Sequence, residues 1–435
     1  MAGPSLYQQV LDYTNRANPY PLYAEMRKTP VARQDDGSYV VSTYQEITAL
    51  LHDPRISSDL RKRTEAGEAP AGGDQAYGPA AQESAGGAAA TGDTSASAGP
   101  PGPAIPPSFL VLDPPEHDRL RRLAMRQFGP PNKPGRVDGM RGDFDGMVKG
   151  LIDGLRDKKQ IDIVDDFASP FPVTVISDLL GVPHEDEARF HGWADEIIAG
   201  LDPNRPQATT EGDERHDAQL ELAQYMAGLM QAHAQKPGDD LLSGLITDNG
   251  PEGRMSPVDM VISGTLLLIA GHETTVNLIT NGMLTLLRYP DVLERLRREP
   301  ELAMTMVEEL LRYEPPVQML PQRTALTDIT IAGSTIPKGV PVILVLAAGN
   351  RDPGRFDDPD RFIPDRADNQ HLGFGSGIHN CFGQPMARLE VQMALTELVR
   401  RLENPRLVQD PPPYRPNPFL RGPQHLLVEV DGVRD

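Results

Sequence analysis

The sequence predicts a mainly α-helical fold with a minor β region. A long, nearly uninterrupted helical segment spans residues 256–290, and a second strong helix begins at Pro385. Between them, from Asp328, apolar and polar residues alternate around turn residues, which is typical of short strands. Helices that enclose a small sheet region are therefore the expected architecture.

The segment 256–290 carries the signals of one long central helix. Ser256 is a suitable N-cap, Pro257 occupies the first helical position, and the helix should end before Pro290. Roughly 32 residues at 1.5 Å each give a rod of about 48 Å, enough to cross a whole domain. The segment is apolar on nearly every side up to Ala270, so we expect it to run through the core.

The two ends of the chain add one further element each. At the N-terminal end, a turn at residues 35–37 predicts a small hairpin that leads into a helix within 39–53. At the C-terminal end, apolar residues recur at helical spacing on two neighbouring faces after Pro385. They are Met386, Leu389 and Met393 on one face, and Val391, Leu395, Leu398 and Leu402 on the other.

The 435 residues are expected to form a single domain over 1–435 with one long insertion. The insertion, about 64–107, consists mostly of Ala, Gly, Pro, Ser and Thr and cannot bury enough apolar surface to offset its ordering entropy. Periodic sequence resumes on both sides of it, so it lies inside the domain. A mobile loop is the simpler interpretation, and a functional lid is the alternative.

Charge and cysteine content exclude several classes of protein. A net charge of −20 argues against nucleic acid as a partner. The single cysteine excludes an internal disulfide and fits a reducing compartment. The start of the chain lacks a secretory signal, and the longest apolar run, 258–270, is too short and too polar to anchor the chain in a membrane. We therefore expect a cytoplasmic protein.

That one cysteine, Cys381, lies in the segment GFGSGIHNCFG, residues 373–383, here called the cysteine loop. A helix N-terminus follows it and favours a thiolate. Glycines in the loop, including Gly375 and Gly383, allow the backbone to fold tightly around the sulfur and to approach a flat ligand. Phe374 can shield the sulfur from water. These features suit a sulfur that is an axial ligand of heme iron.

Other readings of the cysteine loop stay open on residue chemistry alone. A lone cysteine is usually a small buried hydrophobic residue. A hydrolase nucleophile would need a base, and His379 is closer in sequence than such partners normally are. Cys381 with His371 and His379 would supply too few ligands for a structural zinc site. Glycines can also cradle a phosphate, but no strand–GK[ST] context is present.

The segment FGSGIHNCFG resembles the heme-binding signature of the cytochrome P-450 family, F-G-x-G-x-H-x-C-x-G, at every fixed place. The resemblance runs from about Pro19 to Val428 and leaves out only the insertion. It implies the cytochrome P-450 fold, with the long central helix over heme b (iron protoporphyrin IX). It also implies that Cys381 is the metal ligand, with Phe374, Gly375 and Gly383 around the cofactor.

The motif AGHETT, residues 270–275, lies in the middle of the long helix. Thr274 can donate a hydrogen bond to the carbonyl of Ala270, and with Gly271 nearby this would loosen one turn and open a groove. Close helix packing through small residues is the alternative reading. The resemblance implies that the groove at Ala270 and Gly271 holds O2. It also implies that Glu273 and Thr274 form a catalytic acid–alcohol pair that delivers protons.

The motif EELLR, residues 308–312, places Glu309 and Arg312 one helical turn apart, and such pairs are common on surfaces. The resemblance implies instead a buried structural triad whose third member is the arginine of a P-x-R-F segment, here Arg361.

The resemblance also implies how the two heme propionates are held. His117 and Arg121 lie at i,i+4 on one helix face, Arg323 begins the strand region, and His379 lies in the cysteine loop. Arginine pairs bidentately with carboxylates. A solvated basic face is the alternative for His117 and Arg121 alone.

The predicted function is heme-thiolate monooxygenation: insertion of one oxygen atom from O2 into an apolar small molecule such as a fatty acid, polyketide macrolide or terpenoid. A ferredoxin or flavodoxin with an NAD(P)H-dependent reductase would supply electrons, docking on a basic patch. The patch would consist of Arg119, Arg122, Arg126 and Arg388. The substrate pocket would be lined by Leu266, Ile269, Val317, Met319 and Phe419. The alternatives are a peroxide-driven heme peroxygenase and a non-catalytic heme sensor or carrier.

Overall fold

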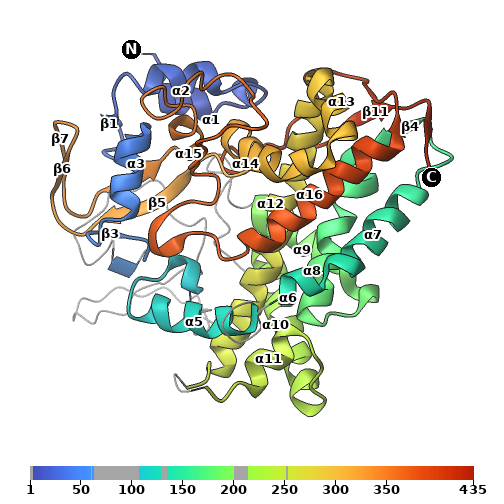
Figure 1. The fold of residues 1–435 in the computed structure, drawn as a ribbon. Helices are drawn as coiled ribbons and strands as arrows, with labels where there is room; N and C mark the ends of the chain where they lie inside the picture. Colours follow the sequence, from blue (N-terminus) through green and yellow to red (C-terminus); the bar gives the residue numbers. More distant parts are fainter. Residues whose placement is uncertain (1–2, 60, 63–106, 129–134, 200–213, 251–252) are drawn as a thin grey trace, which may run out of the picture.

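The computed structural model describes residues 3–59, 61–62, 107–128, 135–199, 214–250 and 253–435 (Figure 1). Its α-helices are α1 Leu6–Leu11, α2 Tyr20–Met26, α3 Tyr44–Leu51, α5 Glu116–Phe128, α6 Arg136–Gly139, α7 Arg141–Asp153, α8 Pro170–Leu180, α9 Glu187–Ala199, α10 Glu214–Gln235, α11 Leu241–Thr247, α12 Pro257–Arg288, α13 Pro290–Arg298, α14 Ala303–Tyr313, α15 Leu346–Gly349 and α16 Gln384–Arg401. Its β-strands are β1 Val31–Arg33, β2 Tyr39–Val41, β3 Ile56–Ser57, β4 Gln160–Asp162, β5 Leu320–Ala325, β6 Ile329–Ile331, β7 Ser334–Ile336, β8 Pro341–Leu344, β9 Leu402–Glu403, β10 Arg406–Leu407, β11 Leu427–Glu429 and β12 Gly432–Val433. The mainly α-helical prediction with a minor β region is confirmed.

The long helix α12 begins and ends where the sequence predicts. The Ser256 side chain accepts a hydrogen bond from the N–H of Asp259, whose own carboxylate accepts one from the N–H of Ser256. This reciprocal capping box satisfies two of the amide groups that a helix start leaves unpaired. Pro257 follows as the first helical residue, and the helix continues for 32 residues.

The most buried part of α12 lies after Ala270 and not before it, which corrects the sequence prediction. Every residue from Thr275 to Leu286 is buried, whereas Val258 near the start is 52% exposed. The polar side chains tolerate this burial because they donate hydrogen bonds. Thr285 donates to the carbonyl of Asn281, and the Asn281 amide donates to the carbonyl of Arg421. The earlier turns are less buried because they border a cavity.

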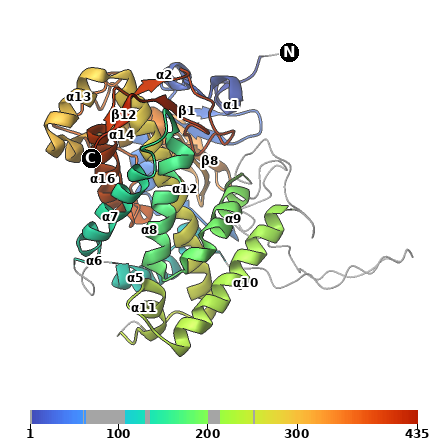
Figure 2. The ribbon, with the colours of Figure 1, turned by 90° about the vertical axis from the view of Figure 1, so that its right-hand side faces the viewer.

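The other helices enclose α12. It packs against α8 and α10 on one side and against α14 and α16 on another. Figure 2 shows α8, α9 and α10 on the side of the molecule that covers α12. The predicted C-terminal helix is α16, and Leu389, Val391, Leu395 and Leu398 are all buried in it.

Strands β1, β3 and β5 lie next to α3 on the left of Figure 1, whereas β4 and β11 lie on the opposite side, near the C-terminus. The largest sheet among the described residues has the order β1-β2-β8-β5-β3, in which only β2 and β8 are parallel. The predicted hairpin is the antiparallel pair β1–β2, and α3 follows it. Strand β5 brings Leu320, Pro321 and Arg323 to the cavity that α12 borders. The sheet therefore supplies one wall of that cavity.

The low-complexity insertion 64–107 lies, except for Pro107, outside the described residues. Within the described parts of the chain, no helix combines the length and apolar character needed to cross a membrane.

The predicted triad is present, but its third member is Arg366 and not Arg361. Glu309 and Arg312 are completely buried and joined by two hydrogen bonds of 2.8 Å. The Arg366 guanidinium adds a second ion pair to Glu309 at 3.1 Å. Arg361 is exposed and contributes only its carbonyl, which accepts from Arg312 at 3.1 Å. The segment 359–361 turns so that its backbone, not its side chain, faces the triad.

This geometry predicts opposite outcomes for two neighbouring arginines. Replacing Arg312 or Arg366 by alanine removes a partner of a buried carboxylate and should cost ~3–5 kcal/mol of stability, with little folded protein recovered. Arg361→Ala, the matched control, should stay within about 0.5 kcal/mol of the parent protein. Urea denaturation measures both. If Arg361→Ala were destabilised and Arg366→Ala kept the stability of the parent protein, Arg361 would be the third member of the triad, as the sequence predicts.

Candidate active site

A cavity of about 450 Å³ lies between α12, the sheet and the cysteine loop. Most of the sequence-predicted site residues line it. They are Ala270, Gly271, Glu273 and Thr274 of α12, Phe374, Gly375, His379, Cys381 and Gly383 of the cysteine loop, and Arg121 and Arg323. The predicted pocket residues Leu266, Ile269, Val317, Met319 and Phe419 line it as well. Segments distant in the sequence therefore meet at one site.

The cysteine loop is held in a tight backbone conformation. The N–H of Cys381 donates to the carbonyl of Phe374 at 2.9 Å. Gly375 and Gly377 have φ angles of 68° and 69°, a left-handed conformation that favours glycine. At Gly377 a Cβ atom would also lie 2.1 Å from the carbonyl oxygen of Leu51. These constraints place Cys381 just before α16, as the sequence predicts.

Gly383 differs from the other loop glycines. Its φ of −77° suits any residue, and a Cβ atom there would meet only the Cys381 sulfur, at 3.8 Å. The protein itself therefore does not require glycine at this position. Because Gly383 borders the cavity, its missing side chain leaves room for a ligand to approach the sulfur closely.

The electrostatic environment of the sulfur is mixed. Burial raises the pKa of the Cys381 thiol, and the backbone N–H of Gly383 and the charge of Arg121 act in the opposite direction. Arg121 also braces the loop, because its guanidinium donates to the carbonyl of Asn380 at 2.5 Å. A bound metal ion would favour the thiolate further.

Basic side chains gather at one end of the cavity. The rings of His117 and His379 lie 4.4 Å apart, and the buried Nε2 atom of each has no hydrogen-bond partner among the described residues. Burial lowers the pKa of Arg323 to about 10, against the opposing charge of Asp113. It also lowers the pKa of His379 to about 3, with Arg323 adding to the shift. The desolvated Arg323 cation and the neutral His379 ring, whose Nε2 atom has no partner among the described residues, suit a ligand that carries carboxylates.

The wall formed by α12 carries a hydroxyl and a carboxylate. Thr274 Oγ1 donates to the carbonyl of Ala270 at 2.8 Å, which confirms the hydrogen bond predicted from the sequence. The helix is continuous through this turn, so the predicted loosening does not interrupt it. Glu273 is buried, accepts a hydrogen bond of 3.1 Å from Asn277 and forms an ion pair of 3.2 Å with Arg415.

The family model described as Cytochrome P450 matches residues 105–430, most of the chain. The chain belongs to the cytochrome P450 family. Cytochrome P450 monooxygenase PikC of Streptomyces venezuelae is 37% identical over 424 residues, which cover 95% of this chain and 91% of that protein. The 6-deoxyerythronolide B hydroxylase of Saccharopolyspora erythraea is 35% identical over 423 residues, covering 95% and 96%.

Solved structures agree with the assignment. CYP164A2 of Mycobacterium smegmatis, in its ligand-free state, superposes with a TM-score of 0.81 at 35% identity, covering 98% of this chain and 99% of that one. The cytochrome P450 PksS of Bacillus subtilis gives a TM-score of 0.80 at 30% identity, covering 97% and 99%. The P450 fold predicted from the sequence is confirmed. The protein is an oxidoreductase of the monooxygenase type, and heme b is its cofactor.

The residues of the cavity fit heme b. Cys381 offers one sulfur ligand at the wall, and the missing side chain of Gly383 leaves space next to that sulfur. The unpartnered Nε2 atoms of His117 and His379 lie with Arg121 and Arg323 at the basic end, where two propionates would be bound. The donor set thus matches both the metal and the charged edge of the cofactor.

Sequence reasoning missed several residues that shape this site. Arg415, the partner of Glu273, lies in a loop without helical or strand periodicity. Glu390 of α16 is 1% exposed, lines the cavity, and burial raises its pKa well above the usual range. Both depend on contacts between segments far apart in the chain. Only the fold reveals such contacts.

The predicted basic patch is largely neutralised. Arg119 pairs with Asp259 at 3.3 Å, and Arg126 pairs with Asp248 at 3.0 Å. Arg388 pairs with Glu308 at 2.6 Å. The sequence could not anticipate this, because all three acidic partners come from other helices or loops.

Arg323 provides a direct test of the basic end. If Arg323 holds a heme propionate, Arg323→Gln would remove a charge-assisted hydrogen bond worth about 1.5–3 kcal/mol, and heme should be lost roughly tenfold to a hundredfold faster. Transfer of heme to an excess of scavenger protein measures the rate. Arg122→Gln, an exposed arginine of α5, is the control and should not change it. An unchanged rate for Arg323→Gln would show that Arg323 does not hold the cofactor.

Proposed function

We propose that this protein is a heme-thiolate monooxygenase that inserts one oxygen atom from O2 into an apolar small molecule. Cys381 is the iron ligand in this proposal, and Glu273 with Thr274 are the catalytic acid–alcohol pair. The observation that carries it is that the cysteine loop and the Ala270–Thr274 turn of α12 line the same cavity. Heme bound through sulfur supplies the chemistry of O2 activation.

The protein's own residues divide the remaining work. His117, Arg121, Arg323 and His379 bind the propionates and set the orientation of the cofactor, with Phe374, Gly375 and Gly383 beside the sulfur and Ala270 and Gly271 on the facing helix. Thr274 keeps a hydroxyl at the cavity wall, anchored on the carbonyl of Ala270. Glu273, the next residue towards the N-terminus, connects that wall to Arg415 and Asn277 and so offers a path for protons.

The proposed substrate is an apolar small molecule, with polyketide macrolides first among the candidates. Leu266, Ile269, Val317, Met319 and Phe419 give the cavity a predominantly apolar lining. Such a lining binds hydrophobic ligands and rejects charged ones. Two relatives carry matching names, a polyketide biosynthesis P450 and a 6-deoxyerythronolide B hydroxylase. Fatty acids and terpenoids are the further candidates.

We propose a ferredoxin or flavodoxin, reduced by an NAD(P)H-dependent reductase, as the electron donor. The arginines near the cysteine loop would make the docking surface, although acidic partners offset much of their charge. Docking should therefore depend only moderately on salt.

We also propose that residues 1–435 form one P450 domain, with the insertion at 64–107 as an addition to it. Contacts between the two ends of the chain support this proposal. The Arg421 guanidinium donates to the carbonyls of Arg16 and Ala17 at 2.8 Å each. Strand β2, near the N-terminus, pairs with β8 in the largest sheet.

Thr274→Ala tests the acid–alcohol assignment. The hydroxyl is lost but the cysteine loop is untouched, so heme content should stay normal while reducing equivalents are diverted to hydrogen peroxide. We expect most of the NAD(P)H consumed to appear as peroxide instead of hydroxylated product. Thr275→Ala is the matched control: its hydroxyl donates to the carbonyl of Gly271, and coupling should be retained. Full coupling in Thr274→Ala would remove the catalytic role of Thr274.

The reaction class is tested by supplying each oxidant separately. With NAD(P)H, reductase and O2, a substrate identified by its displacement of the axial water in the heme spectrum should give a product one oxygen atom heavier. Turnover with hydrogen peroxide alone, and none with the reductase system, would favour a peroxygenase. Substrate binding without product under either condition would favour a sensor or carrier.

A further inference from the structure

We infer that Glu308 and Arg388 form a charge pair that sets the reduction potential of the heme iron through the cysteine loop. The inference rests on the proposed role of Cys381 as iron ligand. The pair lies beside the cysteine loop, because Glu308 belongs to α14 and Arg388 to α16. Neither residue takes part in the reaction itself.

The pair is built with fixed geometry. Arg388 Nε donates to one carboxylate oxygen of Glu308 at 2.6 Å, and a terminal nitrogen donates to the other at 2.9 Å. Such two-point pairs restrain both side chains. Burial opposes ionisation of Glu308, but hydrogen bonds from His371 and Arg388 lower its pKa to about 2. The carboxylate is therefore charged at neutral pH.

His371 completes the arrangement from the segment that precedes the cysteine loop. Its Nδ1 atom accepts a hydrogen bond of 3.0 Å from the N–H of Gly373, so in the neutral ring the proton is on Nε2. Nε2 lies 3.1 Å from the second carboxylate oxygen of Glu308 and donates to it. Glu308 therefore accepts hydrogen bonds from a residue that precedes Cys381 in the sequence, His371, and from one that follows it, Arg388.

Arg388 reaches the cysteine loop by two routes. Its third nitrogen donates to Gln384 Oε1 at 2.8 Å, and the Gln384 amide donates to the carbonyl of Cys381 at 2.9 Å. Its guanidinium carbon also lies 4.7 Å from the centre of the Phe374 ring. The backbone carbonyl of Phe374 in turn accepts a hydrogen bond from the N–H of Cys381.

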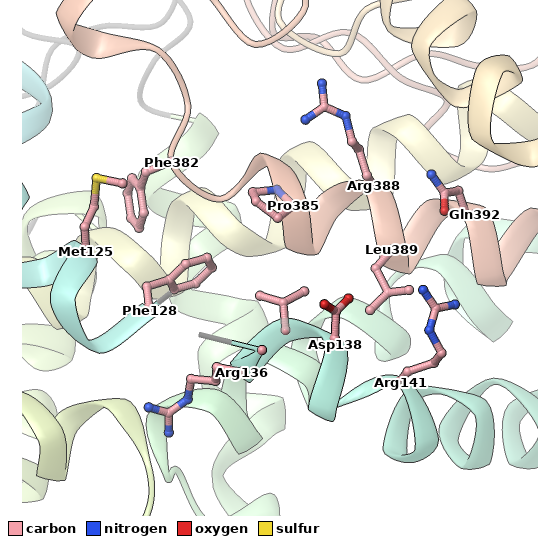
Figure 3. Close-up of a pocket in the computed structure, with 12 residues that line it drawn as sticks. Met125, Phe128, Arg136, Asp138, Arg141, Phe382, Pro385, Arg388, Leu389 and Gln392 are labelled. Atoms are coloured by element: carbon pink, nitrogen blue, oxygen red, sulfur yellow. The ribbon is translucent and has the colours of Figure 1, made fainter. Parts of the chain in front are cut away.

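Glu308 is the acidic side chain that pairs with Arg388. Arg388 borders a second cavity, of about 430 Å³, together with Phe382 and Leu389. Asp138 lines the same cavity, but Figure 3 shows Arg388 leaving α16 in a direction away from Asp138. The Arg388 and Glu308 side chains are 32% and 27% exposed, so water screens the pair only in part.

The sign of each effect follows from electrostatics. Reduction adds one negative charge to the heme iron and its cysteine ligand. A nearby positive charge therefore favours the reduced form, and a nearby negative charge disfavours it. Arg388→Gln should lower the midpoint potential and Glu308→Gln should raise it. Each change should shift the equilibrium constant for reduction by about three- to tenfold, where tenfold corresponds to 59 mV for one electron. The double variant should return close to the parent value.

The experiment is a redox titration of the heme-loaded full-length protein, followed by its absorption spectrum. Arg388→Lys keeps the charge and should retain a near-parent potential, which separates charge from mere packing. Arg400→Gln is the matched control, because Arg400 forms a similar pair with Glu397 at 2.7 Å on the same helix, three turns further on. It should leave the potential unchanged. If one single variant fails to bind heme, the other still decides, since its shift has a defined sign.

Three results would overturn the inference: equal potentials in all variants, shifts of the same sign in Arg388→Gln and Glu308→Gln, or an Arg388→Lys variant that behaves like Arg388→Gln. These outcomes are distinguishable from failure of the proposed function. Each reduced variant is first checked for the carbon monoxide absorption of sulfur-ligated heme. If that absorption is present and the potentials do not move, only the inference is wrong.

Discussion

The position of one sulfur atom is the constraint on which the rest of the structure depends. Cys381 is placed by a hydrogen bond from its N–H to Phe374, by two left-handed glycines and by the start of α16. Around it, α12, β5 and the cysteine loop enclose a cavity with an apolar body and a basic end. Only a cofactor that combines a metal, a flat apolar ring and anionic groups uses all three features together.

The charged groups near this cavity follow a common logic. Ionisable side chains that the fold removes from water are paired, as Glu309 is with Arg312 and Arg366, or they lie at the cavity, as His379 does with His117 beside it. The first arrangement stabilises the scaffold on one side of the cysteine loop. The second provides buried polar groups that can bind an anionic ligand. One fold therefore contains both structural and functional uses of buried charge.

Local sequence signals predicted what depends on local geometry. The Ser256 cap, the β1–β2 hairpin and the bond from Thr274 to Ala270 each involve residues a few positions apart, and the structure contains all of them. Predictions about partners distant in the chain were less reliable. Arg366 replaces Arg361 because the backbone turns at 359–361, and nothing near Arg415 in the sequence indicates its contact with Glu273. Periodicity predicts which face of a helix is buried, but it does not predict which residues pack against that face.

Carbon monoxide binding tests the central claim most directly. The purified protein, loaded with heme, is reduced and exposed to carbon monoxide while its absorption spectrum is recorded. If Cys381 supplies a thiolate to the iron, the strongly red-shifted band of sulfur-ligated heme appears. A folded, heme-loaded protein that instead gives the spectrum of nitrogen-ligated heme would contradict the account.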